Sequence, residues 1–143
     1  MKRRKIESID ELLETLQQLQ EQDVDRDSRY YEIVSVLKKL YQIVRQDRSN
    51  KYLLSPEYVK NQIVKYLVHY GTYLKTVYRK DDLLAEKKLQ EALKYEKMLP
   101  IAYYRLGFLA YKARNYVEAM NHFLEAIKTN EQCRNIRYQL NEL

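Results

Sequence analysis

Few of the residues that build sheets, metal sites or disulfide frameworks are present in this chain. Its 143 residues include two glycines, two prolines, one cysteine and no tryptophan. So little turn-forming chemistry argues against a multistranded sheet, and the lone Cys133 cannot form an internal disulfide. No apolar run approaches the roughly 20 residues of a membrane-spanning helix, and no signal-peptide core follows the charged N-terminus. We therefore expect a cytoplasmic protein without a membrane span.

Residues that carry enzymatic chemistry are also scarce. His69 and His122 are the only histidines, and neither stands beside a cysteine or carboxylate at metal-ligand spacing. Glycine-rich phosphate loops are absent. The adjacent carboxylates Asp81 and Asp82 are better explained as helix caps than as an acid/base pair. We expect no catalytic residue, no metal and no cofactor.

The composition itself favours amphipathic helices. Hydrophobic residues make up 45% of the chain and charged residues 32%, which is too apolar for a disordered tail. Of the net charge of +6, four positive charges lie in the first five residues, MKRRK. This tail allows nonspecific attraction to nucleic acid or anionic lipid, but a solvated chain end is the simpler explanation. We regard nucleic-acid binding as the weaker alternative.

The stretch from 100 to 130 has the most demanding pattern. In a helical hairpin, small residues at Gly107, Ala119 and Ala126 let two helices approach closely, while Leu106 and Phe123 fill the space between them. The pattern recurs, because three residues of matching size precede Ala119, Phe123 and Ala126 by 34 positions each: Ala85, Leu89 and Ala92. A fixed period of this length indicates a helical repeat.

The order of Tyr103, Leu106, Gly107, Ala119, Phe123 and Ala126 resembles the tetratricopeptide repeat (TPR), a helical hairpin with the same period. The resemblance implies an all-α fold of α-α hairpins, a short right-handed solenoid. Repeat one then spans 66–99 and repeat two spans 100–133, within a repeat region of 55–133. Residues 134–143, with Arg134 as the first, form a capping helix or open a third repeat.

Two registers remain open for the first helix of repeat one. The strict repeat period places His69, Thr72 and Tyr73 where repeat two has Tyr103, Leu106 and Gly107. Aligning Gly71 with Gly107 instead requires two extra residues. The choice matters because a two-residue shift turns a helix by roughly 200°.

The resemblance also implies a concave groove lined by the first helix of each repeat. In repeat two its positions hold Ile101, Tyr104, Phe108, Tyr111 and Lys112. In repeat one the strict register gives Leu67, Tyr70, Leu74, Val77 and Tyr78, and Tyr138 would extend the surface. The alternative is that the N-terminal helices fill the groove, which would make Tyr104, Phe108 and Tyr111 core residues.

Two helices are predicted in the N-terminal region, 1–54. Ser8 with Glu11 forms a capping box at the start of a helix of about 14 residues, whose apolar stripe contains Ile9, Leu12, Leu13, Leu16 and Leu19. A second amphipathic helix is expected over 28–45. These helices either cap the repeats or form a dimerisation arm that uses Leu12, Leu16 and Leu19.

Three further helices have recognisable starts. After a linker at 46–55, the run Ser55, Pro56, Glu57 begins a helix of about 24 residues that includes the first helix of repeat one. Asp81 or Asp82 caps the helix of Ala85. Asn115 with Glu118 marks the start of the helix of Ala119.

These features lead to one functional hypothesis and one main alternative. The first is a non-catalytic interaction module, an adaptor that binds a peptide or helix of another protein in its aromatic groove. The alternative is a self-associating structural or scaffold module, a possible homo-oligomer, that forms the N-terminal part of a longer regulatory protein.

Overall fold

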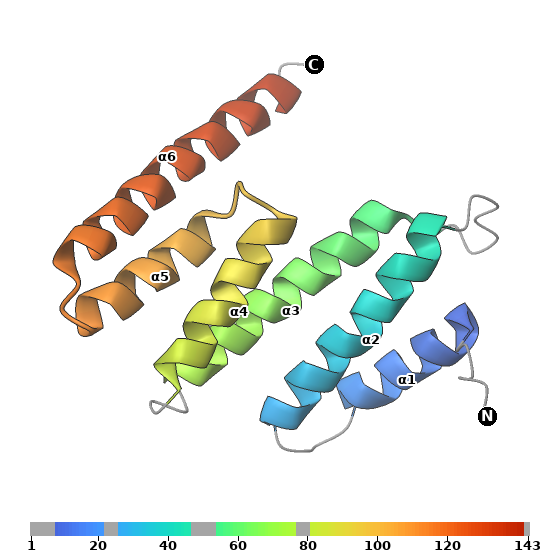
Figure 1. Ribbon diagram of the computed structural model, residues 1–143. Helices are drawn as coiled ribbons and strands as arrows, with labels where there is room; N and C mark the ends of the chain where they lie inside the picture. The colour runs from blue at the N-terminus through green and yellow to red at the C-terminus, as the bar shows by residue number, and fades with distance from the viewer. Residues whose placement is uncertain (1–7, 22–25, 47–53, 77–80, 142–143) are drawn as a thin grey trace. The chain divides into compact units, whose positions relative to one another are not determined.

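The computed structural model describes residues 8–21, 26–46, 54–76 and 81–141, and these ranges are helical without strands. The helices are α1 (Ile9–Glu21), α2 (Arg26–Gln46), α3 (Pro56–Thr76), α4 (Asp82–Tyr95), α5 (Pro100–Lys112) and α6 (Tyr116–Asn141) (Figure 1). The predicted all-α class is confirmed. No helix in the described ranges has the length and apolar character needed to cross a membrane.

Three helix starts follow from the predicted capping residues. In each case the backbone N–H three residues further along donates to the cap side chain: to Ser8 Oγ at 3.2 Å, Ser55 Oγ at 3.1 Å and Asp81 Oδ1 at 3.3 Å. These bonds satisfy donors that the first turn of a helix leaves without a partner. The expected starts of α1, α3 and α4 are therefore confirmed.

The chain forms two compact units that divide between Tyr66 and Leu67, inside α3. The N-terminal part of α3 belongs with α1 and α2. Gln20 Nε2 donates to Tyr66 Oη at 2.9 Å, and the ring centroids of Tyr30 and Tyr66 are 6.5 Å apart. These contacts tie the N-terminal part of α3 to both helices of the first unit.

In the first unit, α1 packs on α2. Leu12 and Leu19 of α1 are buried, as are Ile33, Leu37 and Leu40 of α2. A dimerisation arm requires an exposed leucine stripe on α1. Burial of Leu12 and Leu19 removes two of the three leucines that this alternative used.

In the second unit, α4 packs on α5 and α5 packs on α6. The side chains that face these contacts are small or branched, as the hairpin pattern requires. The buried set includes Ala85, Leu89, Ala92, Leu106, Gly107, Ala119 and Ala126, whereas Tyr103 and Phe123 are half-buried.

A tight reversal joins α5 to α6. The N–H of Asn115 donates to the carbonyl oxygen of Ala110 at 2.9 Å, and the N–H of Arg114 donates to that of Tyr111 at 3.0 Å. This is the Schellman pattern of a helix C-terminus. Arg114 occupies its left-handed position, with φ of 65°, where glycine is usual. The reversal brings the N-terminal half of α6 back along α5 (Figure 1).

Glycine allows the close approach of helices in both hairpins. A Cβ at Gly71 would lie 2.9 Å from Leu89 Cγ, and a Cβ at Gly107 would lie 2.6 Å from Phe123 Cε1. Leu89 and Phe123 are 34 positions apart, which is one repeat period, whereas Gly71 and Gly107 are 36 positions apart. The two glycine contacts therefore correspond when Gly71 is aligned with Gly107, the second of the two registers left open by the sequence.

This register corrects the groove positions assigned to repeat one. Tyr70 and Leu74 are 4% and 2% exposed, and Leu67 is fully buried. With the two-residue offset, Tyr70 and Leu74 match Leu106 and Ala110, which are also buried. This burial does not fit the strict register, because two residues turn a helix by roughly 200° and exchange its faces. Val77 and Tyr78 lie outside the described residues.

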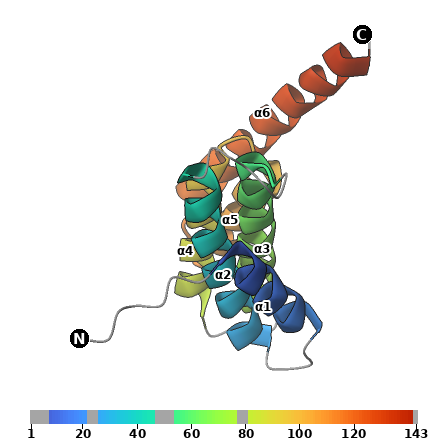
Figure 2. The same cartoon turned by 90° about the vertical axis from the view of Figure 1, so that its right-hand side faces the viewer.

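The expected helix boundary at Arg134 is also wrong. Helix α6 continues without interruption from Tyr116 to Asn141, and this segment contains no glycine or proline that would end it. Figure 2 shows its C-terminal part continuing past α5. Tyr138 lies in this part of α6, but its side chain is outside the described residues.

Candidate functional site

One side of α5 is exposed and mostly aromatic. Ile101, Tyr104, Phe108 and Tyr111 lie at spacings of three and four residues, which places them on one stripe of the helix. Their exposed fractions range from 38% to 58%. Within the second unit these side chains are therefore at the surface, and the alternative in which the N-terminal helices cover Tyr104, Phe108 and Tyr111 stays a prediction.

Three aromatic rings meet where this stripe reaches α6. The ring centroid of Tyr104 lies 4.9 Å from that of Phe108 and 5.8 Å from that of Phe123, and Phe108 and Phe123 are 5.7 Å apart. Two of the three contacts are edge-to-face, an arrangement that each ring's quadrupole favours. We call Tyr104, Phe108 and Phe123 the aromatic cluster. Its contacts limit the rotation of the exposed Tyr104 ring.

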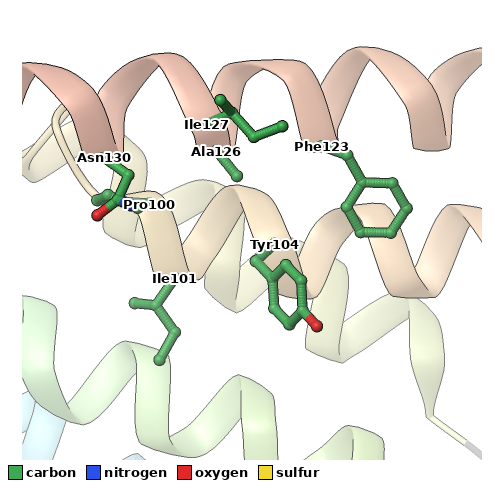
Figure 3. Close-up of a pocket in the computed structure, with 7 residues that line it drawn as sticks. All are labelled: Pro100, Ile101, Tyr104, Phe123, Ala126, Ile127 and Asn130. Atoms are coloured by element: carbon green, nitrogen blue, oxygen red, sulfur yellow. The ribbon is translucent and has the colours of Figure 1, made fainter.

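A hollow of about 560 Å³ opens next to the aromatic cluster, between α5 and α6. We call it the α5–α6 groove, and its lining consists of Pro100, Ile101, Tyr104, Phe123, Ala126, Ile127 and Asn130. Figure 3 shows the α6 residues along one side and Ile101 and Tyr104 of α5 along the other. The volume is within the range of ordinary ligand pockets, roughly 300 to 1,000 Å³.

The chemistry of the groove suits binding rather than reaction. Of its seven lining residues, only Tyr104 and Asn130 have polar side chains, and none is a carboxylate, histidine, cysteine or lysine. Apolar walls accept apolar side chains, while a phenol and an amide can orient a ligand by hydrogen bonding.

Lys112 has a different environment from the one that we expected at the groove edge. Its Nζ lies 3.2 Å from Oδ2 of Asp82, so it forms an ion pair between α5 and α4. The two side chains are 49% and 41% exposed, and such partly exposed pairs contribute little to stability. The charge of Lys112 is thus already paired within the second unit.

The structure brings together only part of the predicted site. The exposed α5 stripe (Ile101, Tyr104, Phe108 and Tyr111) lies beside α6, whereas Tyr70 and Leu74 are buried on α3. The α6 wall of the groove was missed, because Phe123 was assigned to packing alone and Ile127 and Asn130 were not considered. Helical spacing could have identified this wall, because Ile127 and Asn130 follow Phe123 by four and seven residues and so lie on the same side of α6.

Neither a scan of protein-family models nor searches of curated proteins and of solved structures gave a match to this chain. In the described part of the chain, no group of three or more histidine, cysteine, aspartate or glutamate side chains is arranged to hold a metal ion.

Proposed function

We propose that the chain is a non-catalytic, TPR-like adaptor that binds an amphipathic helix or peptide of another protein in the α5–α6 groove. The observation that carries the proposal is the exposure of Ile101, Tyr104 and Phe108 beside an apolar hollow of about 560 Å³. Clustered aromatic side chains of this kind supply much of the binding energy at protein interfaces. The module acts in the cytoplasm, where the unpaired Cys133 stays reduced.

Two observations support the TPR-like part of the proposal. The close approach of Gly71 to Leu89 repeats in the approach of Gly107 to Phe123, and the larger partners are separated by one repeat period. Ala85 and Ala119 are separated by the same period, and both are buried. Two hairpins built by one pattern are what a repeat architecture requires.

The groove favours a helix over an extended strand as its ligand. Its walls are two helices without free backbone donors or acceptors along their length, so a strand would find no ladder of hydrogen bonds. A helix needs only apolar side chains at spacings of three and four residues to contact Ile101, Tyr104 and Ile127. One such side chain can enter the hollow.

The proposal is tested by selecting binders from a displayed library of amphipathic helical peptides, with the full chain as bait. The selected peptide then serves as the probe. Tyr104→Ala should weaken its binding by at least about 10-fold, as expected for an aromatic side chain at the centre of an interface. Tyr111→Ala, at the end of the stripe, should have a smaller effect.

Tyr58→Ala is the matched control, because Tyr58 is 56% exposed on α3, outside the groove. Circular dichroism and urea unfolding should give the same fold for all variants. Equal binding by the wild type and the Tyr104→Ala variant would rule out the groove as the binding site.

A further inference from the structure

Helix α6 carries a second apolar surface beyond the residues that pack on α5. Val117, Met120, Leu124 and Ile127 are 57% to 78% exposed, and they follow one another at spacings of three, four and three residues. We call these four residues the α6 stripe. Such spacing produces a straight apolar seam on a helix. A contiguous apolar patch of this kind on a small protein marks an interaction surface.

The hairpin fold does not require this stripe. Residues one repeat period earlier occupy the equivalent places on α4, and they are Leu83, Glu86, Gln90 and Leu93. Two of these four are polar, and α4 nevertheless packs on α5. The apolar character of Met120 and Leu124 therefore serves a contact that α4 does not make.

Charged side chains at the two ends of the stripe indicate the orientation of its partner. At the N-terminal end, Arg114 helps to line a hollow of about 590 Å³ that also includes Val117. At the C-terminal end, the exposed Glu131 follows Ile127 by four residues, in line with the stripe. The stripe thus has a positive charge at its N-terminal end and a negative charge at its C-terminal end.

We propose that the α6 stripe pairs with the same stripe of a second copy of this chain, with the two α6 helices antiparallel. In this arrangement Val117 meets Ile127 of the second copy, and Met120 meets Leu124. Arg114 then meets Glu131 of the second copy. A parallel pair would instead place Glu131 against Glu131, and like charges in register are unfavourable.

A two-fold axis near the middle of the stripe makes this contact closed and self-complementary. Each ion pair and each apolar contact occurs twice, once on either side of the axis. The α6 stripe shares only Ile127 with the α5–α6 groove, so the dimer does not depend on the groove's binding a partner.

The first test measures the mass of the full chain by light scattering from about 1 µM to about 1 mM, the range expected for an interface of small area. The wild-type mass should rise from 17.4 kDa toward twice that value. Met120→Glu with Leu124→Glu should hold it at the monomer value throughout. A wild type that stays monomeric, or a double variant that associates like the wild type, overturns the proposal.

Leu83→Glu is the matched control, since Leu83 is the repeat equivalent of Val117 and is similarly exposed on α4. This variant should dimerise like the wild type, while Val117→Glu should not. If Leu83→Glu abolishes the dimer and Val117→Glu leaves it intact, the interface is elsewhere. Circular dichroism checks that each variant keeps its helices, which substitutions at these exposed positions should not disturb.

The second test fixes the orientation by cross-linking in a Cys133→Ser background. A mixture of Val117→Cys and Ile127→Cys chains should form mainly mixed disulfide dimers, because antiparallel helices place residue 117 opposite residue 127. Dimers of each variant with itself would indicate parallel helices and contradict the proposed arrangement. Independently, Arg114→Glu and Glu131→Arg should each weaken dimerisation, and the double variant should restore it.

Discussion

A side-chain carbon at position 107 would lie 2.6 Å from Cε1 of Phe123, closer than carbon atoms approach without displacement. Glycine at this position therefore lets the Phe123 ring rest against the backbone of α5. The same ring contacts Tyr104 and Phe108. The shape of the aromatic cluster thus depends on a hydrogen atom at position 107.

Replacing either helical glycine should destabilise the second unit. Alanine has a higher helix propensity by about 1 kcal/mol, but overpacking costs about 1 to 3 kcal/mol. Gly107→Ala should lose about 1 kcal/mol, because the half-buried Phe123 ring can turn away. Gly71→Ala should lose more, since its Cβ would meet the buried Leu89 and the carbonyl oxygen of Ala85, at 3.2 Å. Urea unfolding measures both values, and a stabilised Gly71→Ala chain would contradict this account.

Enlarging the small residue at the α5–α6 contact should also destabilise the hairpin. Ala119 is 2% exposed, so the longer side chain in Ala119→Leu must displace its neighbours. We expect a loss of about 1 to 3 kcal/mol in the free energy of unfolding. Asn121→Leu, an exposed position two residues further along α6, is the control and should change little. Equal thermal stability of the Ala119→Leu chain and the wild type would argue against the packing described.

The cap of α4 should matter more than the ion pair beside it. Asp81→Ala removes the acceptor of the Leu84 N–H and should cost about 1 kcal/mol. Lys112→Gln breaks the ion pair with Asp82 and should change stability by less than about 0.5 kcal/mol, because both side chains are partly exposed. Denaturant titration of the two variants gives the comparison, and a larger loss in Lys112→Gln would reverse this ranking.

A glycine at the reversal between α5 and α6 should stabilise the chain. Arg114 adopts a left-handed conformation that costs a non-glycine residue roughly 1 kcal/mol. Arg114→Gly should therefore raise the free energy of unfolding by about 0.5 to 1 kcal/mol, provided the chain is kept dilute enough to be monomeric. Arg114→Ala controls for loss of the charge and should give no gain. Identical stability of these two variants would mean that backbone strain at residue 114 is not the cause.

Local signals were sufficient to predict most helices. Ser8, Ser55 and Asp81 cap their helices by side-chain hydrogen bonds that depend only on residues three positions apart. Such signals do not depend on tertiary packing, which is why these starts could be read from the chain.

The inner face of α3 could not be fixed in the same way. Its orientation depends on where Gly71 meets Leu89, a contact between helices, and counting by the repeat period missed the two extra residues. The glycine itself was the better guide, because only glycine permits so close an approach. Similarly, the repeat period suggested a boundary at Arg134, although nothing in the local sequence ends α6 there.

The candidate site was predicted on one wall only. The resemblance to the TPR implied groove positions at Ile101, Tyr104, Phe108 and Tyr111, and all four are exposed. The opposite wall and the α6 stripe were not predicted, because α6 is apolar on two sides and a repeat pattern explains only the side that packs on α5. Which side of such a helix remains exposed depends on its neighbours in space.

The division of the chain inside α3 affects how the protein unfolds. A helix interior extends at little cost once its first turn has formed, whereas a new nucleus is unfavourable. Tyr66 and Leu67 are consecutive residues of one hydrogen-bonded helix, so order on either side of this point favours order on the other. Melting of α3 would expose buried side chains of both units, such as Ile63 of the first and Leu67 of the second. We therefore expect the two units to lose their structure together.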